Sequence, residues 1–338
     1  MKAAVLVKHG APETAFEIRE VPTPAIKAGE VLIKVEGFGL NFADVMARQG
    51  LYPDAPPMPA IIGYDVAGTV VEVAPDITHV RVGDRVTAMT RFGGYAEYVA
   101  ALGMGTAKIA DSAPVGEATA LTTQYCTAYF AAAEVVNLYE GDRVLIHSAA
   151  GGVGTALLQY ARHKGCEIFA TAGSDAKIKM LQQSSVHHAI NYVTQDFEAE
   201  VARITGGRGV DVIFDAVGGS YLKKGIRALA PGGRIVCYGA SSISDKNIFG
   251  KIGTLIGFGF YHPLQFMKSS KALIGVNMLR IADNSPLRLN RCLVNVVRLY
   301  EQGVFKPIVG KVFPVSQLAE AHAYLGGRGS TGKVTVTW

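Results

Sequence analysis

Apolar and polar positions divide the chain into two regions with different periodicity. Up to about residue 110, short apolar runs alternate with segments that contain proline or glycine, a pattern typical of β-strands joined by turns. The strands predicted there are Lys2–Val7, Val31–Phe38, Gly68–Val73, Arg85–Thr90 and Ala96–Val99, with one short helix over Asn41–Arg48. This region is expected to be mostly β-structure.

From Val115 onward, strand-like runs alternate with helical periodicity. The predicted strands are Val144–Ile146, Glu167–Thr171, Ala189–Asn191, Val210–Phe214, Arg234–Tyr238 and Ala272–Leu279. The predicted helices are Ala118–Val136, one after Gly154, Ala176–Gln183, Phe197–Thr205, Tyr221–Leu229 and the amphipathic Pro286–Tyr300. Such alternation implies a doubly wound parallel six-stranded sheet with helices on both faces. The tail returns to strand and turn character, ends in a strand over Lys333–Thr337 and is expected to rejoin the first region.

The stretch from Asp142 to Lys164 carries the first candidate chemistry. Its strand is followed by the small-residue turn SAAGGVG (148–154) and then by a helix. Glycines in such a turn let backbone N–H groups approach a pyrophosphate, and the helix N-terminus faces it with partial positive charge. Ala149 stands where the first glycine of the dinucleotide fingerprint usually stands, so the motif alone also fits an ordinary tight turn.

The ends of the other predicted strands support a nucleotide site. Small or polar residues follow them at Gly173-Ser174, Tyr192, residues 215–218 and residues 239–241, where a doubly wound sheet holds its ligand. An NAD site normally has an acid at the end of the second strand. Ser174 and Lys177 in that place favour a 2′-phosphate and hence NADP, although Asp175 is an alternative acid displaced by two residues.

Composition narrows the class of protein. A chain of 338 residues suggests two domains, and 49% apolar with 18% charged residues provides a large core. The net charge of +5 comes without a basic run and does not indicate nucleic acid binding. Four widely spaced cysteines indicate a reducing compartment, so a cytoplasmic location is expected. The N-terminus reads as a strand and not as a signal peptide, and glycines and Pro263 interrupt the long uncharged runs, so no transmembrane segment is expected.

The sequence resembles the zinc-free quinone oxidoreductases of the medium-chain dehydrogenase/reductase superfamily. The motifs that carry the resemblance are GLNFAD (39–44), RQGLYP (48–53), GDRV (83–86), AAGGVG (149–154), AGS (172–174), INY (190–192) and DAVG (215–218). HPL (262–264) and GVNML (275–279) are most similar to the branch that includes the vesicle amine transport proteins. The resemblance implies a GroES-like domain over 1–123, completed by 303–338, and a Rossmann NADP-binding domain over 124–302. It also implies a homodimer through the sixth strand, 272–279.

The resemblance further implies a set of NADP(H)-binding positions. In order along the chain these are Asn41, Tyr52, Thr127, Gly151, Gly152, Val153, Gly154, Ser174, Lys177, Tyr192, Val217, Gly239, Ser241, Val276, Asn277 and Arg328. Three of these residues have an alternative interpretation without nucleotide binding. Asn41 could be a turn residue, Tyr52 a half-buried aromatic residue in the core, and Arg328 part of a flexible loop. Zinc-dependent relatives carry a cysteine near position 41 and Gly-His-Glu near 63, whereas this chain has Asn41 and Gly63-Tyr64-Asp65. No metal site is therefore expected.

Without a metal to polarise an alcohol, electron-poor acceptors remain as substrates. The expected reaction is hydride transfer from NADPH to a quinone or an α,β-unsaturated carbonyl, with Asn41, Tyr52 and Tyr64 as candidate catalytic residues. Residues 249–267, rich in glycine and aromatics, are a candidate substrate lid. Two other functions stay open. The first is an enoyl-thioester reductase that uses Lys223, Lys224 and Lys246, and the second is a low-turnover lipid- or membrane-binding protein that retains the NADP site.

Overall fold

The computed structural model describes residues 1–243, 253, 257–327 and 329–338, which form two compact units. Unit 1 comprises Met1–Cys126 and Met278–Trp338, and unit 2 comprises Thr127–Asn277.

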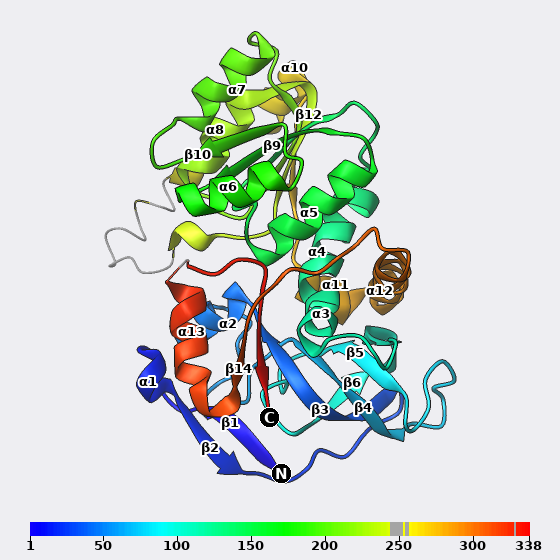
Figure 1. The fold of residues 1–338 in the computed structure, drawn as a ribbon. Helices are drawn as coiled ribbons and strands as arrows, with labels where there is room; N and C mark the ends of the chain where they lie inside the picture. Colours follow the sequence, from blue (N-terminus) through cyan, green and yellow to red (C-terminus); the bar gives the residue numbers. More distant parts are fainter. Residues whose placement is uncertain (244–252, 254–256, 328) are drawn as a thin grey trace. The chain divides into compact units, whose positions relative to one another are not determined.

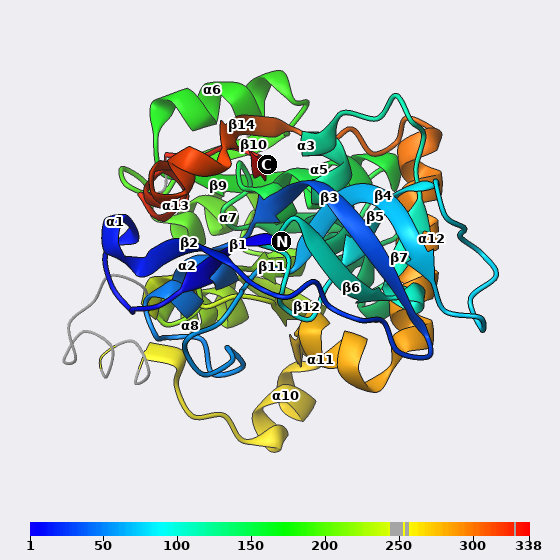
Figure 2. The same ribbon diagram turned by 90° about the horizontal axis from the view of Figure 1, so that it is seen from below.

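Unit 1 is built on a seven-stranded sheet with the strand order β14-β15-β3-β4-β5-β7, and β6 pairs with β3 (Figure 2). Its strands are β3 (Glu30–Leu40), β4 (Asp65–Val73), β5 (Arg85–Met89), β6 (Tyr98–Leu102), β7 (Thr106–Lys108), β14 (Val309–Pro314) and β15 (Lys333–Thr337), with a separate pair β1 (Lys2–Leu6) and β2 (Phe16–Glu20). β15 pairs antiparallel with β3, from Val334 opposite Leu40 to Thr337 opposite Gly37. The prediction that the tail rejoins the mostly β region is confirmed.

The helices of unit 1 are α1 (Pro12–Ala15), α2 (Phe42–Arg48), α3 (Val115–Ala120), α11 (Met278–Asn284), α12 (Pro286–Glu301) and α13 (Leu318–Gly326), with the short helical turns η1 (Gly103–Gly105), η2 (Leu121–Tyr125) and η5 (Val315–Gln317). Some of these helices, α3, α12 and α13 among them, contact strands of this sheet. The helix predicted over 118–136 is made of α3, η2, α4 (Cys126–Tyr129) and η3 (Phe130–Val135), and η2 and η3 are π-helical.

Unit 2 is built on a six-stranded parallel sheet with the order β10-β9-β8-β11-β12-β13. The strands are β8 (Arg143–Ile146), β9 (Glu167–Ala172), β10 (His188–Asn191), β11 (Val210–Asp215), β12 (Leu229–Cys237) and β13 (Ala272–Gly275). The helices are α5 (Gly152–His163), α6 (Asp175–Gln183), α7 (Phe197–Thr205), α8 (Ser220–Ala228) and α10 (Pro263–Ser269), with a turn η4 (Ser241–Ile243). The chain winds from β8 outward to β10 and then returns to β11 beside β8, so a switch point for ligand binding lies at β8.

Helices cover both faces of this sheet, as the strand–helix alternation predicts. Val144, Leu145 and Ile146 of β8 are all fully buried, which is typical of a parallel strand covered on both sides. Leu145 belongs to a core cluster with residues of α7 and α8. α5 and α6 contact β8 and β9 and lie on the near side of the sheet in Figure 1. The expected α/β architecture, with a GroES-like mostly-β domain and a Rossmann-type sheet, is confirmed.

Two boundaries differ from the prediction. The sixth strand ends at Gly275 instead of Leu279, because Met278, Leu279 and Ala282 have the spacing of a helix and are the buried side chains of α11. Residues 278–302, expected in the Rossmann domain, belong to unit 1. The buried face of α12 packs on η1 and β7, and Tyr300 Oη donates a 2.7 Å hydrogen bond to Glu117.

None of the described helices is both long enough and apolar enough to cross a lipid bilayer. Part of the proposed lid, residues 249–252 and 254–256, lies outside the described residues.

Candidate functional site

The turn between β8 and α5 forms the first part of the candidate site, within unit 2. Ser148 has a φ of +53°, which turns the chain sharply after β8, and Gly151 caps α5. The first N–H groups of a helix have no acceptor within the helix, and its dipole adds partial positive charge there. The turn therefore places Gly151, Gly152 and Val153 where they can bind a pyrophosphate.

Gly154 is required by close packing. A Cβ atom at this position would lie 2.4 Å from the Ser148 carbonyl oxygen and 2.6 Å from the Ala149 Cα atom. Both are backbone atoms, so a rotamer change cannot relieve the clash. At Gly151, by contrast, the one neighbour that a Cβ atom would meet within 4 Å is the Ser148 carbonyl oxygen, at 3.2 Å.

The end of β9 provides a second polar group. Ser174 caps α6, and its Oγ atom accepts a 3.4 Å hydrogen bond from the Lys177 backbone N–H. The Lys177 side chain is half-buried, and this burial lowers the pKa of its ammonium group. Tyr192 reaches over the strand end, since a Cβ atom at Gly173 would lie only 2.3 Å from the Tyr192 hydroxyl oxygen. The structure thus brings Ser174, Lys177 and Tyr192 to the ends of two neighbouring strands.

Asp175, the acid that leaves the choice of nucleotide open, is hydrogen-bonded. Asn191 Nδ2 donates to Asp175 Oδ1 at 2.9 Å, and Asn191 is only 9% exposed. Sequence reasoning weighed Asp175 but missed Asn191. The INY motif was the available signal, because it places Asn191 beside Tyr192.

The ends of β11, β12 and β13 complete this edge of the sheet. Asp215 Oδ1 accepts hydrogen bonds from the N–H groups of Val217 (2.7 Å) and Gly218 (3.0 Å). The Ser241 N–H donates to the Ala216 carbonyl at 3.1 Å, so the turns after β11 and β12 pack together. A Cβ atom at Gly239 would lie 2.8 Å from the same carbonyl oxygen.

The remaining predicted residues are distributed as follows. The Val276 N–H donates to the Cys237 carbonyl at 2.8 Å, which holds Val276 beside β12, and Asn277 next to it is exposed. Thr127 is buried at the start of unit 2. Arg328 lies outside the described residues.

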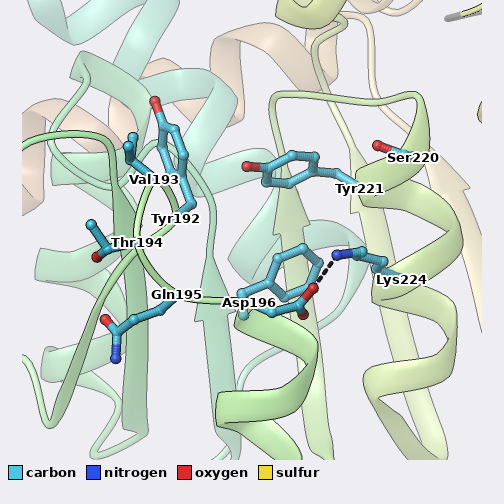
Figure 3. A pocket seen from close by; sticks show the side chains of 9 residues that line it. Tyr192, Val193, Thr194, Gln195, Asp196, Ser220, Tyr221 and Lys224 are labelled. Carbon is cyan, nitrogen blue, oxygen red and sulfur yellow. Dashed lines mark hydrogen bonds and ion pairs between the residues drawn. The ribbon is translucent and has the colours of Figure 1, made fainter.

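A pocket of about 310 Å³ opens between the loop after β10 and the start of α8. Figure 3 shows Tyr192 on the side of the loop and Tyr221 on the side of α8, with the ion pair between Asp196 and Lys224 below Tyr221. The Tyr192 and Tyr221 rings are perpendicular, with centroids 6.2 Å apart. This pocket therefore adjoins the residues at the end of β9 through Tyr192.

His147 lies beneath these strand ends and was not predicted. It is fully buried, with its ring centroid 4.6 Å from that of Phe197 and 5.1 Å from that of Tyr221. Its Nδ1 atom lies 3.1 Å from Thr171 Oγ1, and burial lowers the pKa of the imidazole to about 4. His147 is therefore a neutral side chain that packs β8 and β9 against α7 and α8.

In unit 1, Asn41 belongs to a buried polar group that we name the Asp65 cluster (Asn41, Asp44, Asp65 and Lys333). Asn41 Nδ2 donates to Asp65 Oδ2 at 2.8 Å, and the Asn41 N–H donates to Asp44 Oδ2 at 2.7 Å. Lys333 Nζ donates to Asn41 Oδ1 at 3.1 Å and to the two oxygens of Asp65 at 2.9 and 3.1 Å. Asn41, only 6% exposed, thus ties α2 to β4 and β15.

The charges of the Asp65 cluster follow from its burial. Asp65 and Lys333 are fully buried and form an ion pair. Burial raises the pKa of Asp44 to about 8, so this carboxyl group is largely protonated at neutral pH. Sequence reasoning found Asn41 but missed its partners, because Lys333 is far away in the sequence and the pattern of β15 gives no sign that its lysine is buried.

The Asp65 cluster does not fit a zinc ion. Structural and catalytic zinc sites use three or four Cys, His, Asp or Glu ligands. Here the Asp65 and Asn41 oxygens surround an ammonium group, which would repel a cation at the same place. Across the described ranges, no three His, Cys, Asp or Glu side chains are grouped so as to hold a metal ion.

Tyr52 and Tyr64 lie together in unit 1. Their rings meet edge to face with centroids 6.0 Å apart, and the Phe92 ring lies 5.1 Å from that of Tyr64. Tyr64 is 5% exposed, and its hydroxyl group lies within hydrogen-bonding reach of the Tyr52 hydroxyl group. Burial raises the pKa of both phenols, so both keep their protons at neutral pH and can donate a hydrogen bond.

Comparisons with known proteins identify the family. The profile of the alcohol dehydrogenase GroES-like domain matches residues 27–111, and that of the zinc-binding dehydrogenase matches residues 152–283. The rat synaptic vesicle membrane protein VAT-1 homologue is 34% identical over 96% of this chain and 81% of its own length. A 2-haloacrylate reductase from Burkholderia is 33% identical over 99% of this chain and 98% of its own length. Human quinone oxidoreductase is 30% identical over 99% of this chain and 97% of its own length.

Solved structures give the same result. The Escherichia coli quinone oxidoreductase complexed with NADPH superposes with a TM-score of 0.87 at 26% identity, over the full length of both chains. A mycobacterial protein complexed with NADPH superposes with a TM-score of 0.87 at 27% identity, also over the full length of both chains. The CurK enoyl reductase superposes with a TM-score of 0.86 at 27% identity, over 99% of this chain and 98% of its own. The chain belongs to the quinone oxidoreductase family of the medium-chain dehydrogenase/reductase superfamily.

Proposed function

We propose that the protein is an NADPH-dependent oxidoreductase that transfers hydride, without a metal ion, to a quinone or an α,β-unsaturated carbonyl compound. The observation that carries the proposal is which chemical groups line the candidate site in each unit. Unit 2 gathers phosphate-binding groups at its strand ends, whereas the Asp65 cluster of unit 1 is centred on an ammonium group.

The residues of unit 2 fit a phosphorylated dinucleotide. Gly151, Gly152 and Val153 would hold the pyrophosphate at the start of α5, where the first N–H groups have no acceptor within the helix. Ser174, Lys177 and Tyr192 would bind the 2′-phosphate through a hydroxyl, an ammonium and a phenol group. The NADPH complexes of two relatives support this choice of nucleotide.

NADPH, when bound, supplies the hydride, and the chain's own residues bind and orient the reactants. Reduction of an enone or a quinone develops negative charge on a carbonyl oxygen, and this charge is stabilised by a hydrogen-bond donor. Tyr64 supports this role best, because its hydroxyl keeps its proton in a buried site beside Tyr52. Tyr52, in edge contact with Tyr64, is the second candidate donor.

Two observations support an electron-poor acceptor as the substrate: the metal-ligand analysis of this chain and the activities in the names of its relatives. No metal-ligand set is grouped in the described residues, which disfavours simple alcohols as substrates. The names of two relatives point to electron-poor acceptors, since 2-haloacrylate is an α,β-unsaturated acid and the other relative is a quinone oxidoreductase.

An enoyl-thioester reductase is the second candidate, and the likeness to the CurK enoyl reductase favours it. Its carrier phosphate would need a basic surface. Lys224 is paired with Asp196, and Lys246 lies outside the described residues, so Lys223 is the described lysine best placed for this role.

The test is a screen of NADPH oxidation over 9,10-phenanthrenequinone, 1,4-benzoquinone, simple enones and crotonyl thioesters, combined with metal analysis of the purified protein. The proposal predicts turnover with a quinone or an enone and no loss of rate after treatment with a chelator. Turnover of the thioester alone would favour the second candidate. Nucleotide binding without any turnover would favour a binding protein, and stoichiometric zinc would overturn metal independence.

The cytoplasmic location and the homodimer through the sixth strand stay predictions. All four cysteines are free thiols, which agrees with a reducing compartment. β13 is an edge strand of its sheet, and Leu273 on it is 38% exposed. Sedimentation analysis of the purified protein measures the oligomeric state directly.

A further inference from the structure

We propose that Asn191 sets the preference for NADPH over NADH by holding the Asp175 carboxylate away from the 2′ position of the nucleotide. The inference rests on the proposed use of a nicotinamide dinucleotide and adds a positioning residue to it. Asn191 itself would not touch the nucleotide.

Asp175 stands where a carboxylate decides the cofactor. It is the first residue of α6, directly after Ser174 at the end of β9. In doubly wound folds an acid in this region accepts a hydrogen bond from the ribose 2′-hydroxyl of NAD. The same negative charge would repel a 2′-phosphate. A carboxylate close to the 2′ position would therefore strengthen the binding of NADH and weaken the binding of NADPH.

The orientation of the Asn191 amide is fixed by its surroundings. The Val193 N–H donates to Asn191 Oδ1 at 3.1 Å, so the amide oxygen must face Val193. The NH₂ group then faces Asp175, to which it donates at 2.9 Å. Asn191 is also held through its backbone, because its N–H donates to Gln195 Oε1 at 3.1 Å. The amide thus cannot reverse without losing both of its side-chain hydrogen bonds.

The sheet topology gives the direction of this hold. β10, which ends at Asn191, lies on the outer side of β9, whereas β8 and the phosphate-binding turn lie on the inner side. Asn191 therefore draws the Asp175 carboxylate toward the outer edge of the sheet. Ser174, Lys177 and Tyr192 remain as the polar groups that the proposed function assigns to the 2′-phosphate.

The experiment measures the ratio of the dissociation constants, Kd(NADH)/Kd(NADPH), by fluorescence titration of four proteins: wild type, Asn191→Leu, Asp175→Ala and the double variant. Leucine removes the amide donor at nearly constant volume. A hydrogen bond to a charged group corresponds to about 10–100-fold in binding, and the exposure of Asp175 places the effect at the lower end. The ratio is expected to fall about tenfold in Asn191→Leu and to change by no more than about twofold when the same substitution is made in the Asp175→Ala background.

Gln195→Leu is the matched control, because it perturbs the same loop through Asn191 N without touching Asp175. Its ratio is expected to stay within about twofold of the wild-type value. Where Asn191→Leu does not fold, as judged by circular dichroism, Asn191→Asp replaces it. That variant keeps the acceptor for Val193, loses the donor to Asp175 and is expected to lower the ratio as well.

Three results overturn the inference. The first is an unchanged ratio in a folded Asn191 variant. The second is an equal fall in the Asp175→Ala background, which would mean that only the geometry of the loop matters. The third is a wild-type protein that binds neither dinucleotide, which would overturn the proposed function as well. The first two leave NADPH binding by the wild type, and with it the proposed function, intact.

Discussion

Lys333 is the residue on which the Asp65 cluster depends most. It is fully buried and donates hydrogen bonds to Asp65 and Asn41. Removing one partner of a buried ion pair leaves an uncompensated charge, which typically destabilises a protein by about 3–5 kcal/mol. Lys333→Met is therefore expected to lower the free energy of unfolding in urea by about that amount.

Lys34→Met is the control for this substitution, since Lys34 is an exposed residue of β3 in the same sheet. Its effect is expected to stay within about 0.5 kcal/mol. Equal effects of the two variants would show that the buried pair contributes no specific stability.

Lys177 tests the choice of nucleotide. A charged hydrogen bond to a 2′-phosphate contributes about 1.5–3 kcal/mol, or about 10–100-fold in affinity. Lys177→Ala is expected to raise the Kd of NADPH by that factor and to leave the Kd of NADH nearly unchanged, as measured by fluorescence titration. Equal losses for both nucleotides would contradict the assignment of Lys177 to the 2′-phosphate.

Tyr64 tests the proposed hydrogen-bond donor. Tyr64→Phe removes one hydroxyl group from a buried ring that packs on Tyr52 and Phe92. A donor aimed at developing charge typically contributes about 10²–10³ in kcat. The variant is expected to lose kcat by such a factor with little change in KM for a quinone or enone. An unchanged kcat would transfer the role to Tyr52, a ribose hydroxyl or water.

Some residues were accessible from the sequence and others were not. Gly151, Ser174 and Tyr192 stand next to recognisable strand ends, so local pattern alone places them at one edge of the sheet. Lys333 and Asp65 are far apart in the chain and meet only through the pairing of β15 with β3 and of β3 with β4. Asn191 could be seen as part of a motif, but its bond to Asp175 depends on side-chain geometry.

At the scale of elements, the strand–turn–helix unit of β8 and α5 contains the turn that we propose to bind the pyrophosphate. Gly154→Ala would drive a Cβ atom into two backbone atoms of the turn, which must shift to accommodate it. We expect this substitution to weaken NADPH binding by at least about tenfold and to lower the melting temperature. Gly326→Ala in α13 is the control, because the one neighbour that a Cβ atom there meets is a Val45 Cγ1 atom at 3.6 Å, and this variant should leave both quantities close to the wild-type values.

His147 makes the packing of α7 and α8 on the sheet sensitive to pH. Its pKa is lowered by burial from 6.5 to about 4, so the unfolded chain binds the proton more readily. The contribution of neutral His147 to the free energy of unfolding is fully present above pH 6.5 and is lost as the pH falls toward 4. Between pH 7 and pH 5 the loss amounts to about 2 kcal/mol.

His147→Phe should remove this contribution, so the free energy of unfolding of the wild type should fall by about 2 kcal/mol more than that of the variant between these pH values. Comparison with the variant is needed because other groups titrate as well. The pKa of Asp44 is raised to about 8, and its contribution therefore decreases as the pH rises. A difference between wild type and variant that is the same at both pH values would contradict the role of His147.

The order and type of the elements were largely predictable, whereas some of their ends were not. Alternating apolar runs identify the strands of unit 2, and helical spacing identifies α7 within the bounds observed. The end of β13 was misplaced because GVNML is equally apolar as a strand or as the start of α11. Only tertiary packing of Met278 and Leu279 decides between them.

At the scale of the whole molecule, the assignment of 278–302 shows the limit of sequence patterns. The amphipathic face of α12 is evident from its periodicity, but periodicity does not say which core it covers. The contacts with η1, β7 and Glu117 place it in unit 1. Family resemblance gave the kind of fold of both units correctly because it draws on the whole chain, but the boundary at residue 302 that it implied differs from the division into units.

The most direct test of the account is a crystal structure of the protein grown with NADPH. We predict the pyrophosphate on the N–H groups of Gly152 and Val153, and the 2′-phosphate among Ser174, Lys177 and Tyr192, with no metal ion at Asn41 and Asp65. A nucleotide bound elsewhere, or a zinc ion in place of the Lys333 ammonium group, would contradict it.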